Sequence, residues 1–290
     1  PIIHFGLGNA TYIDTLTIQW NSGKMQILTG VTPDQRITLE EQSADRTTQP
    51  YQPPTSWYEE TASPIPFEHH QQTINDFDRQ PLLTFSPSYI GPCMASADVN
   101  GDGRTDLFVG GGEGQSGALF LQEASGRFAQ PKEPDLITDR NYIDAEAIFF
   151  DANGDKAPDL YVASGGYNLY EPGSTDLQDR LYFNDGHGKF TCRKDALPTI
   201  PVSTGCVTVV DANADGHPDL FVGGRVVPGR YPEAPRSYLL LNDGHGMFTD
   251  ATSELAPNLA EVGMVTSAAW ADLDGDQIYE LILAGEWMPV

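Results

Sequence analysis

The chain has 290 residues, which is enough to build a large hydrophobic core without disulfide bonds or a stabilising metal. Its 41 acidic and 16 basic side chains give a formal charge of -25, which would repel nucleic-acid phosphates and anionic lipid, so we expect no nucleic-acid partner. With 29 glycines, 22 prolines and no apolar run of about 18 residues, the composition predicts short strands joined by turns and no membrane span.

The N-terminal region has the pattern of a small β unit. Residues 1–41 alternate apolar and polar positions around Leu16, Ile18 and Trp20, and a turn is predicted at Asn21 to Gly23. The chain starts at Pro1 without an initiator methionine or the apolar core of a signal peptide, so we expect the natural N-terminus to lie upstream.

The next segment, residues 42–68, is rich in proline and polar residues and predicts an extended linker. Within it, WYEET from Trp57 matches the spacing of FTDAT from Phe248. This match offers an alternative in which one blade strand lies near residues 57–61.

One sequence unit then occurs four times. It reads DVNGDGRTDLFVGG from Asp98, DANGDKAPDLYVASGG from Asp151, DANADGHPDLFVGG from Asp211 and DLDGDQIYELILAG from Asp272. Short apolar runs flank each acidic stretch, a third run follows in the first three units, and a glycine-containing turn leads to Phe128, Phe190 or Phe248. Each complete unit is therefore predicted to be a four-stranded meander.

Four strands repeated every 50 to 60 residues are typical of the blades of a β-propeller, since a lone meander exposes a face that a neighbour must cover. The fourth unit stops after its second strand. The predicted fold class is all-β, with an incomplete propeller of four-stranded blades in residues 69–290, the last blade truncated, preceded by the small β unit.

The acidic stretches have oxygen-bearing side chains at positions 1, 3, 5 and 9, a spacing that allows a curled backbone to point them at one cation. Position 7 varies in chemistry, which is expected if only its backbone carbonyl is a ligand. The candidate metal ligands are Asp98, Asn100, Asp102, Arg104 and Asp106; Asp151, Asn153, Asp155, Ala157 and Asp159; Asp211, Asn213, Asp215, His217 and Asp219; and Asp272, Asp274, Asp276, Ile278 and Glu280.

An oxygen-only ligand set favours Ca²⁺ over zinc or copper, and flexible carboxylates favour it over Mg²⁺, so we expect up to four calcium ions. An EF-hand is disfavoured, because position 12 is valine or leucine where that loop needs a bidentate glutamate. The carboxylate at position 9 is expected to close the site instead. An Asx-rich turn without metal would explain one isolated copy but not four in register.

The loops are not identical. Lys156 and Gln277 stand where a glycine would help at position 6, and Ala214 stands for one at position 4, so occupancy is expected to vary. Among the three cysteines, Cys192 and Cys206 could pair if neighbouring strands brought them together.

Other signals carry less weight. Gly112, Gly114 and Gly117 form a GxGxxG pattern, but a strand is predicted where a nucleotide site needs a helix. We interpret His69 and His70 as linker-surface residues and His187 and His245 as turn residues, and Ser116 does not lie in a nucleophile motif. We interpret the aromatic residues Tyr167, Tyr170 and Trp287 as blade-packing residues, with a sugar-stacking platform as the alternative.

At the acidic loops and the DLFVGG strands the sequence resembles the FG-GAP/VCBS repeat family, the calcium-loop propellers that include integrin α-subunit heads. The resemblance covers residues 87 to 290. Residues 1–41, with HFGLG from His4 and TIQWNSG from Thr17, resemble the ASPIC/UnbV domain, although Asn21 stands where that pattern usually has proline.

The resemblance implies a secreted or cell-surface protein with a non-catalytic role in adhesion or recognition of a macromolecular ligand, protein or glycan. The open blade edge adds the expectation that copies of the chain could associate. A glycan-binding or polysaccharide-degrading protein is the alternative, and a chain of thrombospondin-type loops without a core is disfavoured because the apolar strands would then have no role.

Overall fold

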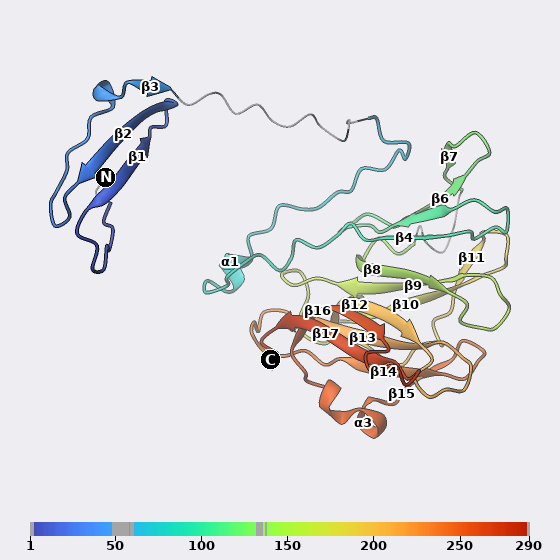
Figure 1. The fold of residues 1–290 in the computed structure, drawn as a ribbon. Helices are drawn as coiled ribbons and strands as arrows, with labels where there is room; N and C mark the ends of the chain where they lie inside the picture. The colour runs from blue at the N-terminus through green and yellow to red at the C-terminus, as the bar shows by residue number, and fades with distance from the viewer. Residues whose placement is uncertain (1–2, 48–57, 59–60, 132–135, 137, 289–290) are drawn as a thin grey trace. The chain divides into compact units, whose positions relative to one another are not determined.

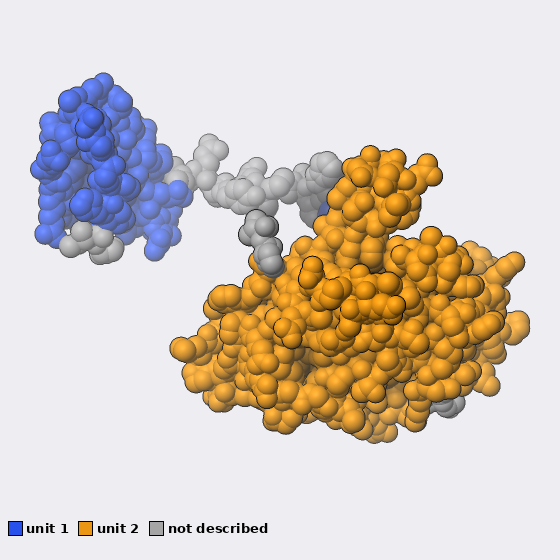
Figure 2. Space-filling view, turned by 90° about the horizontal axis from the view of Figure 1, so that it is seen from below, with its two compact units in different colours: residues 1–62 blue, residues 63–290 orange. Residues whose placement is uncertain are grey.

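The structure is a computed structural model that describes residues 3–47, 58, 61–131, 136 and 138–288. The chain divides into two compact units, residues 1–62 and 63–290 (Figure 2). No described helix combines the length and the apolar character that crossing a membrane requires.

The N-terminal unit is a three-stranded antiparallel sheet in the order β1 (Ile13–Gln19), β2 (Lys24–Val31) and β3 (Arg46–Thr47). The predicted turn joins β1 to β2, with the Trp20 N–H donating to the Lys24 carbonyl at 2.9 Å. Since β3 pairs with the start of β2, the sheet continues past residue 41, through the 3-10 helix Glu41–Ser43. The predicted strand near residues 57–61 falls mainly outside the described residues.

The second unit contains three four-stranded antiparallel sheets and a two-stranded one, each a meander in chain order. The strands are β4 (Met94–Ala97), β5 (Asp106–Val109), β6 (Ala118–Gln122) and β7 (Phe128–Ala129); β8 (Ile143–Phe150), β9 (Asp159–Gly165), β10 (Arg180–Asn184) and β11 (Phe190–Cys192); β12 (Ser203–Val210), β13 (Asp219–Val226), β14 (Tyr238–Asn242) and β15 (Phe248–Asp250); and β16 (Met264–Ala271) with β17 (Glu280–Glu286).

These sheets lie one beside the next, as Figure 1 shows. The first strands of successive sheets contact each other, β4 with β8, β8 with β12, and β12 with β16. This is the arrangement of blades around a common axis, so the predicted all-β, partial propeller is confirmed. The fourth sheet has two strands, as the sequence predicts.

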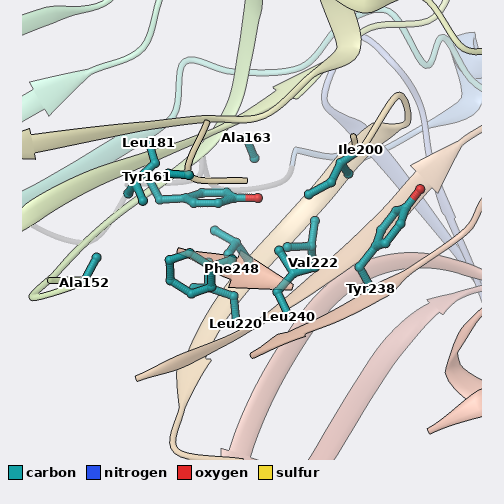
Figure 3. Close-up of a cluster of buried hydrophobic side chains, with 12 residues drawn as sticks. Ala152, Tyr161, Ala163, Leu181, Ile200, Leu220, Val222, Tyr238, Leu240 and Phe248 are labelled. Atoms are coloured by element: carbon teal, nitrogen blue, oxygen red, sulfur yellow. The ribbon is translucent and has the colours of Figure 1, made fainter. Parts of the chain in front are cut away.

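The core lies between the blades and explains the continuous apolar runs. In β9, Tyr161 and Ala163 face the third blade, whereas Leu160 and Val162 face the first. Figure 3 shows the contact with the third blade, where Tyr161 and Leu181 meet Leu220. Because alternate side chains of one strand are buried on opposite faces, both sets must be apolar.

Residues 63–93, here called the cap segment, precede the first blade and form no strand. They include the short helix α1 (Asp76–Arg79). Phe67 packs edge-to-face on Phe120 with ring centroids 6.1 Å apart, and it covers an outer face of the first blade together with Ile65. The Gln115 side chain fixes this part by donating to the Glu68 carbonyl at 2.7 Å and accepting from the His70 N–H at 2.8 Å.

Beyond α1 the cap segment reaches the later blades. Arg79 donates to three carbonyls between β9 and β10, and Gln80 bonds with Tyr231 between β13 and β14. Leu83 is buried among side chains of the second, third and fourth blades. Loops between second and third strands lie opposite those between first and second strands in a meander, so the cap segment lies at the end of the blades away from the acidic loops.

The remaining described helices are single turns at the edges of the blades. They are the 3-10 helices Thr175–Leu177 and Pro257–Leu259 and the α-helix α3 (Thr252–Leu255).

Candidate functional site

The four acidic loops join the first and second strands of the four sheets. We number them loop 1 (98–106), loop 2 (151–159), loop 3 (211–219) and loop 4 (272–280). In every loop positions 4 and 6 have left-handed backbone, including the non-glycine residues Lys156 (φ 74°), Ala214 (φ 59°) and Gln277 (φ 70°). The same curled backbone therefore forms even where glycine is absent, at a conformational cost to those residues.

The aspartate at position 1 organises each loop by accepting backbone N–H groups. Asp98 accepts from Asp102 at 3.1 Å and from Gly103 at 2.7 Å, and Asp151 and Asp211 accept from the corresponding positions of their own loops. Asp272 accepts instead from Gly275 at position 4 and from Gln277 at position 6. Burial acts to raise the pKa of Asp98, but these N–H groups outweigh it and hold the pKa below its usual value. The charged form is thus the one that the loop supports.

Positions 3 and 5 continue this pattern. The side-chain oxygen at position 3 accepts the position 5 N–H, and the position 5 carboxylate accepts the position 7 N–H, in all four loops. The position 7 residues that donate these N–H groups are Arg104, Ala157, His217 and Ile278. Their predicted role as carbonyl ligands stays a prediction.

The position 9 carboxylate is placed differently from the other three. Asp106, Asp159 and Asp219 are fully buried. In loop 2, one oxygen of Asp159 accepts the Ala152 N–H at 3.0 Å and the other accepts the Asn184 N–H at 2.8 Å. Loops 1 and 3 repeat both bonds, so this aspartate ties its loop to the third strand of its blade.

Burial raises the pKa of Asp159 to about 6, with the charges of Asp155 and Asp151 adding to the rise while the two backbone N–H groups oppose it. Burial also raises the pKa of Asp106 and of Asp219. In loops 1 to 3 the described partners of the position 9 carboxylate are backbone N–H groups, so this buried carboxylate is held by hydrogen bonds and by no described salt bridge. The direct contact of position 9 with a metal stays a prediction.

Loop 4 brings three carboxylates together. Oxygen atoms of Asp272, Asp274 and Asp276 all lie within 4.8 Å of one another, and the three residues are exposed. Within the described part of the chain, no other three carboxylate, imidazole or thiol groups converge in this way. Oxygens at this separation fit an ion that takes oxygen ligands at roughly 2.3–2.6 Å, as calcium does.

The donor chemistry of loops 1 to 3 fits the same ion, with an asparagine amide oxygen in place of one carboxylate. Loop 1 differs in one respect, because the Arg104 guanidinium forms an ion pair with Asp102. Among the described residues this is the one salt bridge to an acidic-loop carboxylate. Loop 1 thus has part of its charge compensated by the protein itself.

The opposite end of the blades carries a buried network with its own cation. Arg180 donates to Asp144 at 2.6 Å and stacks over the Tyr142 ring at 4.2 Å. Asp144 also accepts the Gly111 N–H at 2.7 Å, which joins the first and second blades. Although burial lowers the pKa of Arg180, Asp144 raises it, so the guanidinium stays charged.

Beside this pair lies Asp179, which is buried and accepts hydrogen bonds from the Ser164 N–H and the Tyr161 hydroxyl at 2.7 Å each. The Thr204 hydroxyl of the third blade donates to it at 3.1 Å. Burial raises the pKa of Asp179 to about 7, against the lowering effect of these donors.

A cavity of about 700 Å³ opens at this same end. Its lining includes Glu113, Arg140, Tyr170, Glu171 and Asp176, so its charged groups are mostly acidic. The Oε2 atom of Glu113 is buried there without a hydrogen-bond partner. The cavity therefore offers acceptors to a ligand that carries N–H or O–H donors.

The structure changes the interpretation of several other residues. Tyr167 and Tyr170 are buried, at 1% and 7% exposed, which removes them from a sugar-stacking surface, while Trp287 is 67% exposed. His69 is half-buried, and neither ring nitrogen has a hydrogen-bond partner, so it is not the linker-surface residue that the sequence predicted.

His187 and His245 are exposed turn residues whose N–H groups donate to Asp185 and Asp243, as predicted. No disulfide joins Cys192 to Cys206 in the described residues. Burial raises the pKa of Cys206 to about 11 and that of Cys93 further, so neither thiol is activated. Strand β6 follows the GxGxxG pattern, which excludes the nucleotide-site geometry.

Sequence reasoning missed Asn184 and Asn242, the first residues of the NDGHG segments that form the glycine-containing turns before Phe190 and Phe248. Both are buried, and each donates to a backbone carbonyl of the preceding blade. The available signal was the recurrence of asparagine at one fixed place in the second and third units.

Comparison with known protein families agrees with this architecture. Residues 1–46 match the family described as ASPIC and UnbV. Residues 98–162 and 151–222 match the FG-GAP-like repeat, so the matches span loops 1 to 3 and the strands that leave them. No curated protein matches the chain.

Proposed function

Because the chain carries an ASPIC and UnbV segment followed by FG-GAP-like repeats, we propose that its blades form a non-catalytic recognition module that calcium ions stabilise. FG-GAP-like repeats are typical of propeller modules that are often extracellular. In this proposal the module is secreted or displayed at the cell surface and binds a macromolecular ligand.

The observation that carries the proposal is the shared geometry of the four acidic loops. Each points side-chain oxygens from positions 1, 3 and 5 into one turn, and loop 4 brings three carboxylates within 4.8 Å of one another. A bound ion would supply structural cross-linking, since it would replace repulsion among these oxygens by attraction. The residues that would hold it are those at positions 1, 3, 5, 7 and 9 of each loop.

The recognition surface in this proposal is the end of the blades that bears the 700 Å³ cavity. Calcium at one end would hold the blades rigid, so that the loops at the other end keep a fixed arrangement. The acidic lining favours a ligand rich in N–H or O–H donors, whether a basic protein segment or a glycan. The open edge of the last blade would allow association of two copies.

Calcium removal tests the stabilising role. We expect EDTA to lower the melting temperature, and millimolar Ca²⁺ to restore it. Extracellular modules bind Ca²⁺ with a Kd of about 10⁻⁴ to 10⁻³ M, so 1 mM Ca²⁺ would add up to roughly 1.4 kcal/mol for each site. Equal concentrations of Mg²⁺ serve as the control and should restore less. An unchanged melting temperature in EDTA would refute the stabilising role.

A single-loop variant tests whether each ion acts locally. In Asp102→Ala, the calcium-dependent hydrogen-exchange protection of β4 and β5 should fall more than that of β12 and β13. The matched variant Asp215→Ala should reverse this pattern. Equal losses throughout the blades in both variants would contradict local action. A glycan array then separates a glycan ligand from a protein ligand, because adhesion to protein predicts no signal on it.

A further inference from the structure

We infer that Asn184 and Asn242 are positioning residues that couple loop 2 to loop 1 and loop 3 to loop 2, respectively. Ordering of one loop is thereby transmitted to its neighbour. The part of this inference that concerns calcium rests on the proposed function, whereas the hydrogen-bonded link itself does not.

Asn184 lies between loops 1 and 2 and is 3% exposed. Its Nδ2 atom donates to the Val99 carbonyl of loop 1 at 2.8 Å and to the Pro158 carbonyl of loop 2 at 3.2 Å. Its Oδ1 atom accepts the N–H groups of Gly186 and Gly188, both at 3.2 Å. The side chain thus uses both its donors and its acceptor, and one donor crosses to the preceding blade.

Asn242 repeats this arrangement one blade later, and it is also 3% exposed. Its Nδ2 atom donates to the Ala152 carbonyl of loop 2 at 2.8 Å and to the Pro218 carbonyl of loop 3 at 3.1 Å. Its Oδ1 atom accepts from Gly244 and Gly246, both at 3.1 Å. Because the same set of hydrogen bonds occurs in two blades, we attribute it to a specific link between the loops and not to chance packing.

The backbone of each asparagine extends the link to the buried position 9 carboxylate. The Asn184 N–H donates to Asp159, whose other oxygen accepts from Ala152. The Ala152 carbonyl in turn accepts from Asn242, and the Asn242 N–H donates to Asp219. Hydrogen bonds therefore run without a break from loop 1 through loop 2 to loop 3, a contiguous path of the kind that can carry coupling.

The first blade provides an internal comparison. At the corresponding place it has Gln122, whose N–H donates to Asp106 at 2.7 Å as in the other blades. Among the described residues, the Gln122 side chain has no hydrogen bond to an acidic loop, and residues 1–97 contain no acidic stretch of this pattern. The hairpin after Gln122 forms without asparagine, so the turn does not require it. Of these three blades, the two with asparagine are the ones that follow an acidic loop in the given sequence.

Hydrogen exchange on residues 1–290 tests the link, first in EDTA. In Asn184→Ala, the amides of Asp102 and Gly103 in loop 1 should exchange about fivefold to tenfold faster, because the Val99 carbonyl loses its buried donor. In Asn242→Ala the effect should move to loop 2, with loop 1 changed less. The control Gln122→Ala should leave loop 1 unchanged. The pair of asparagine variants keeps the test decisive if one of them folds poorly.

The same experiment in 5 mM Ca²⁺ separates this inference from the proposed function. If calcium protects the wild-type loops, Asn184→Ala should reduce that protection in loop 1 although all its ligands remain. If calcium has no effect on the wild type, the proposed function fails, while faster exchange of loop 1 in EDTA still supports the link. If Asn184→Ala affects loop 2 alone in both conditions, the inference is overturned.

Discussion

The two ends of the blades hold their carboxylates in different ways. At the acidic-loop end the charges are held by backbone N–H groups, and Arg104 is the one cation that forms a described salt bridge there. At the cap end the buried Asp144 is paired with Arg180, and Glu286 of the last blade is paired with Arg225. At the cap end these two carboxylates are therefore paired with cations of the protein, whereas the acidic-loop end leaves most of its charge for an ion from solution.

This difference shows which part of the fold depends on the cations in solution. Interactions between two side chains of the protein are present whenever the chain is folded. Repulsion among loop carboxylates, by contrast, depends on the cations around them. Substitutions at the cap end should change stability equally with and without calcium, and substitutions in the loops should not.

The largest expected effect comes from Arg180→Leu. It leaves Asp144 buried without its cation, and such a loss destabilises by about 3–5 kcal/mol. Denaturant unfolding should show this loss in EDTA and in Ca²⁺ alike. Arg193→Leu is the control, because the side chains of Arg193 and its partner Asp195 are 41% and 70% exposed and their pair should contribute less than about 1 kcal/mol. If the loss of unfolding free energy in Arg180→Leu depended on calcium, the proposed difference between the two ends of the blades would be wrong.

A smaller effect per pH unit, spread over a wide pH range, is expected from Asp179, whose pKa is raised from 3.8 to about 7. A raised pKa means that the folded chain binds the proton more tightly. This contribution is therefore complete below pH 3.8 and is lost as the pH rises to about 7, at up to roughly 1.4 kcal/mol per pH unit.

The variant Asp179→Asn should remove this contribution, so the difference between wild-type and variant unfolding free energies should change over that window. The measurements are made in EDTA, so that calcium binding to the loops does not add a pH dependence of its own. Asp195→Asn, at an exposed site, is the control and should run parallel to the wild type. Parallel curves for Asp179→Asn as well would show that burial does not shift this carboxyl.

The smallest effect is expected in loop 3, where Ala214 has a φ of 59°. Ala214→Gly relieves the strain of left-handed backbone and should raise the unfolding free energy by about 0.5–1 kcal/mol. Ala212→Gly in the same loop has no such strain to relieve and should lower it. Thermal melts of the two variants give the comparison, and a stabilising effect of both would contradict the strain argument.

The sequence predicted the blades well because their determinants are local. Glycine-containing turns, strand-length apolar runs and the repeat of the acidic stretch each lie within a few residues, and the structure places strands where they were expected. Lys156, Ala214 and Gln277 were recognisable as exceptions because the other loops have glycine at those positions.

The cap segment could not be predicted in this way. It has no strand or helix periodicity, and its partners lie far along the chain, as with Arg79 and the carbonyl of Tyr167, 88 residues later. The burial of Asp106, Asp159 and Asp219 was missed for a related reason. In the sequence their carboxylates look the same as those at positions 1 and 5, and only the next strand of the blade distinguishes them.

The cap segment also sets an order of events during synthesis. Gln80 bonds with Tyr231, 151 residues further along, so a ribosome adding about 5–20 residues per second completes that partner roughly 8 to 30 seconds after Gln80. Until then the blades can assemble one upon another through neighbours close in the chain. The part of the cap segment around Gln80 must wait for the third blade, and contacts of such long range form late and slowly.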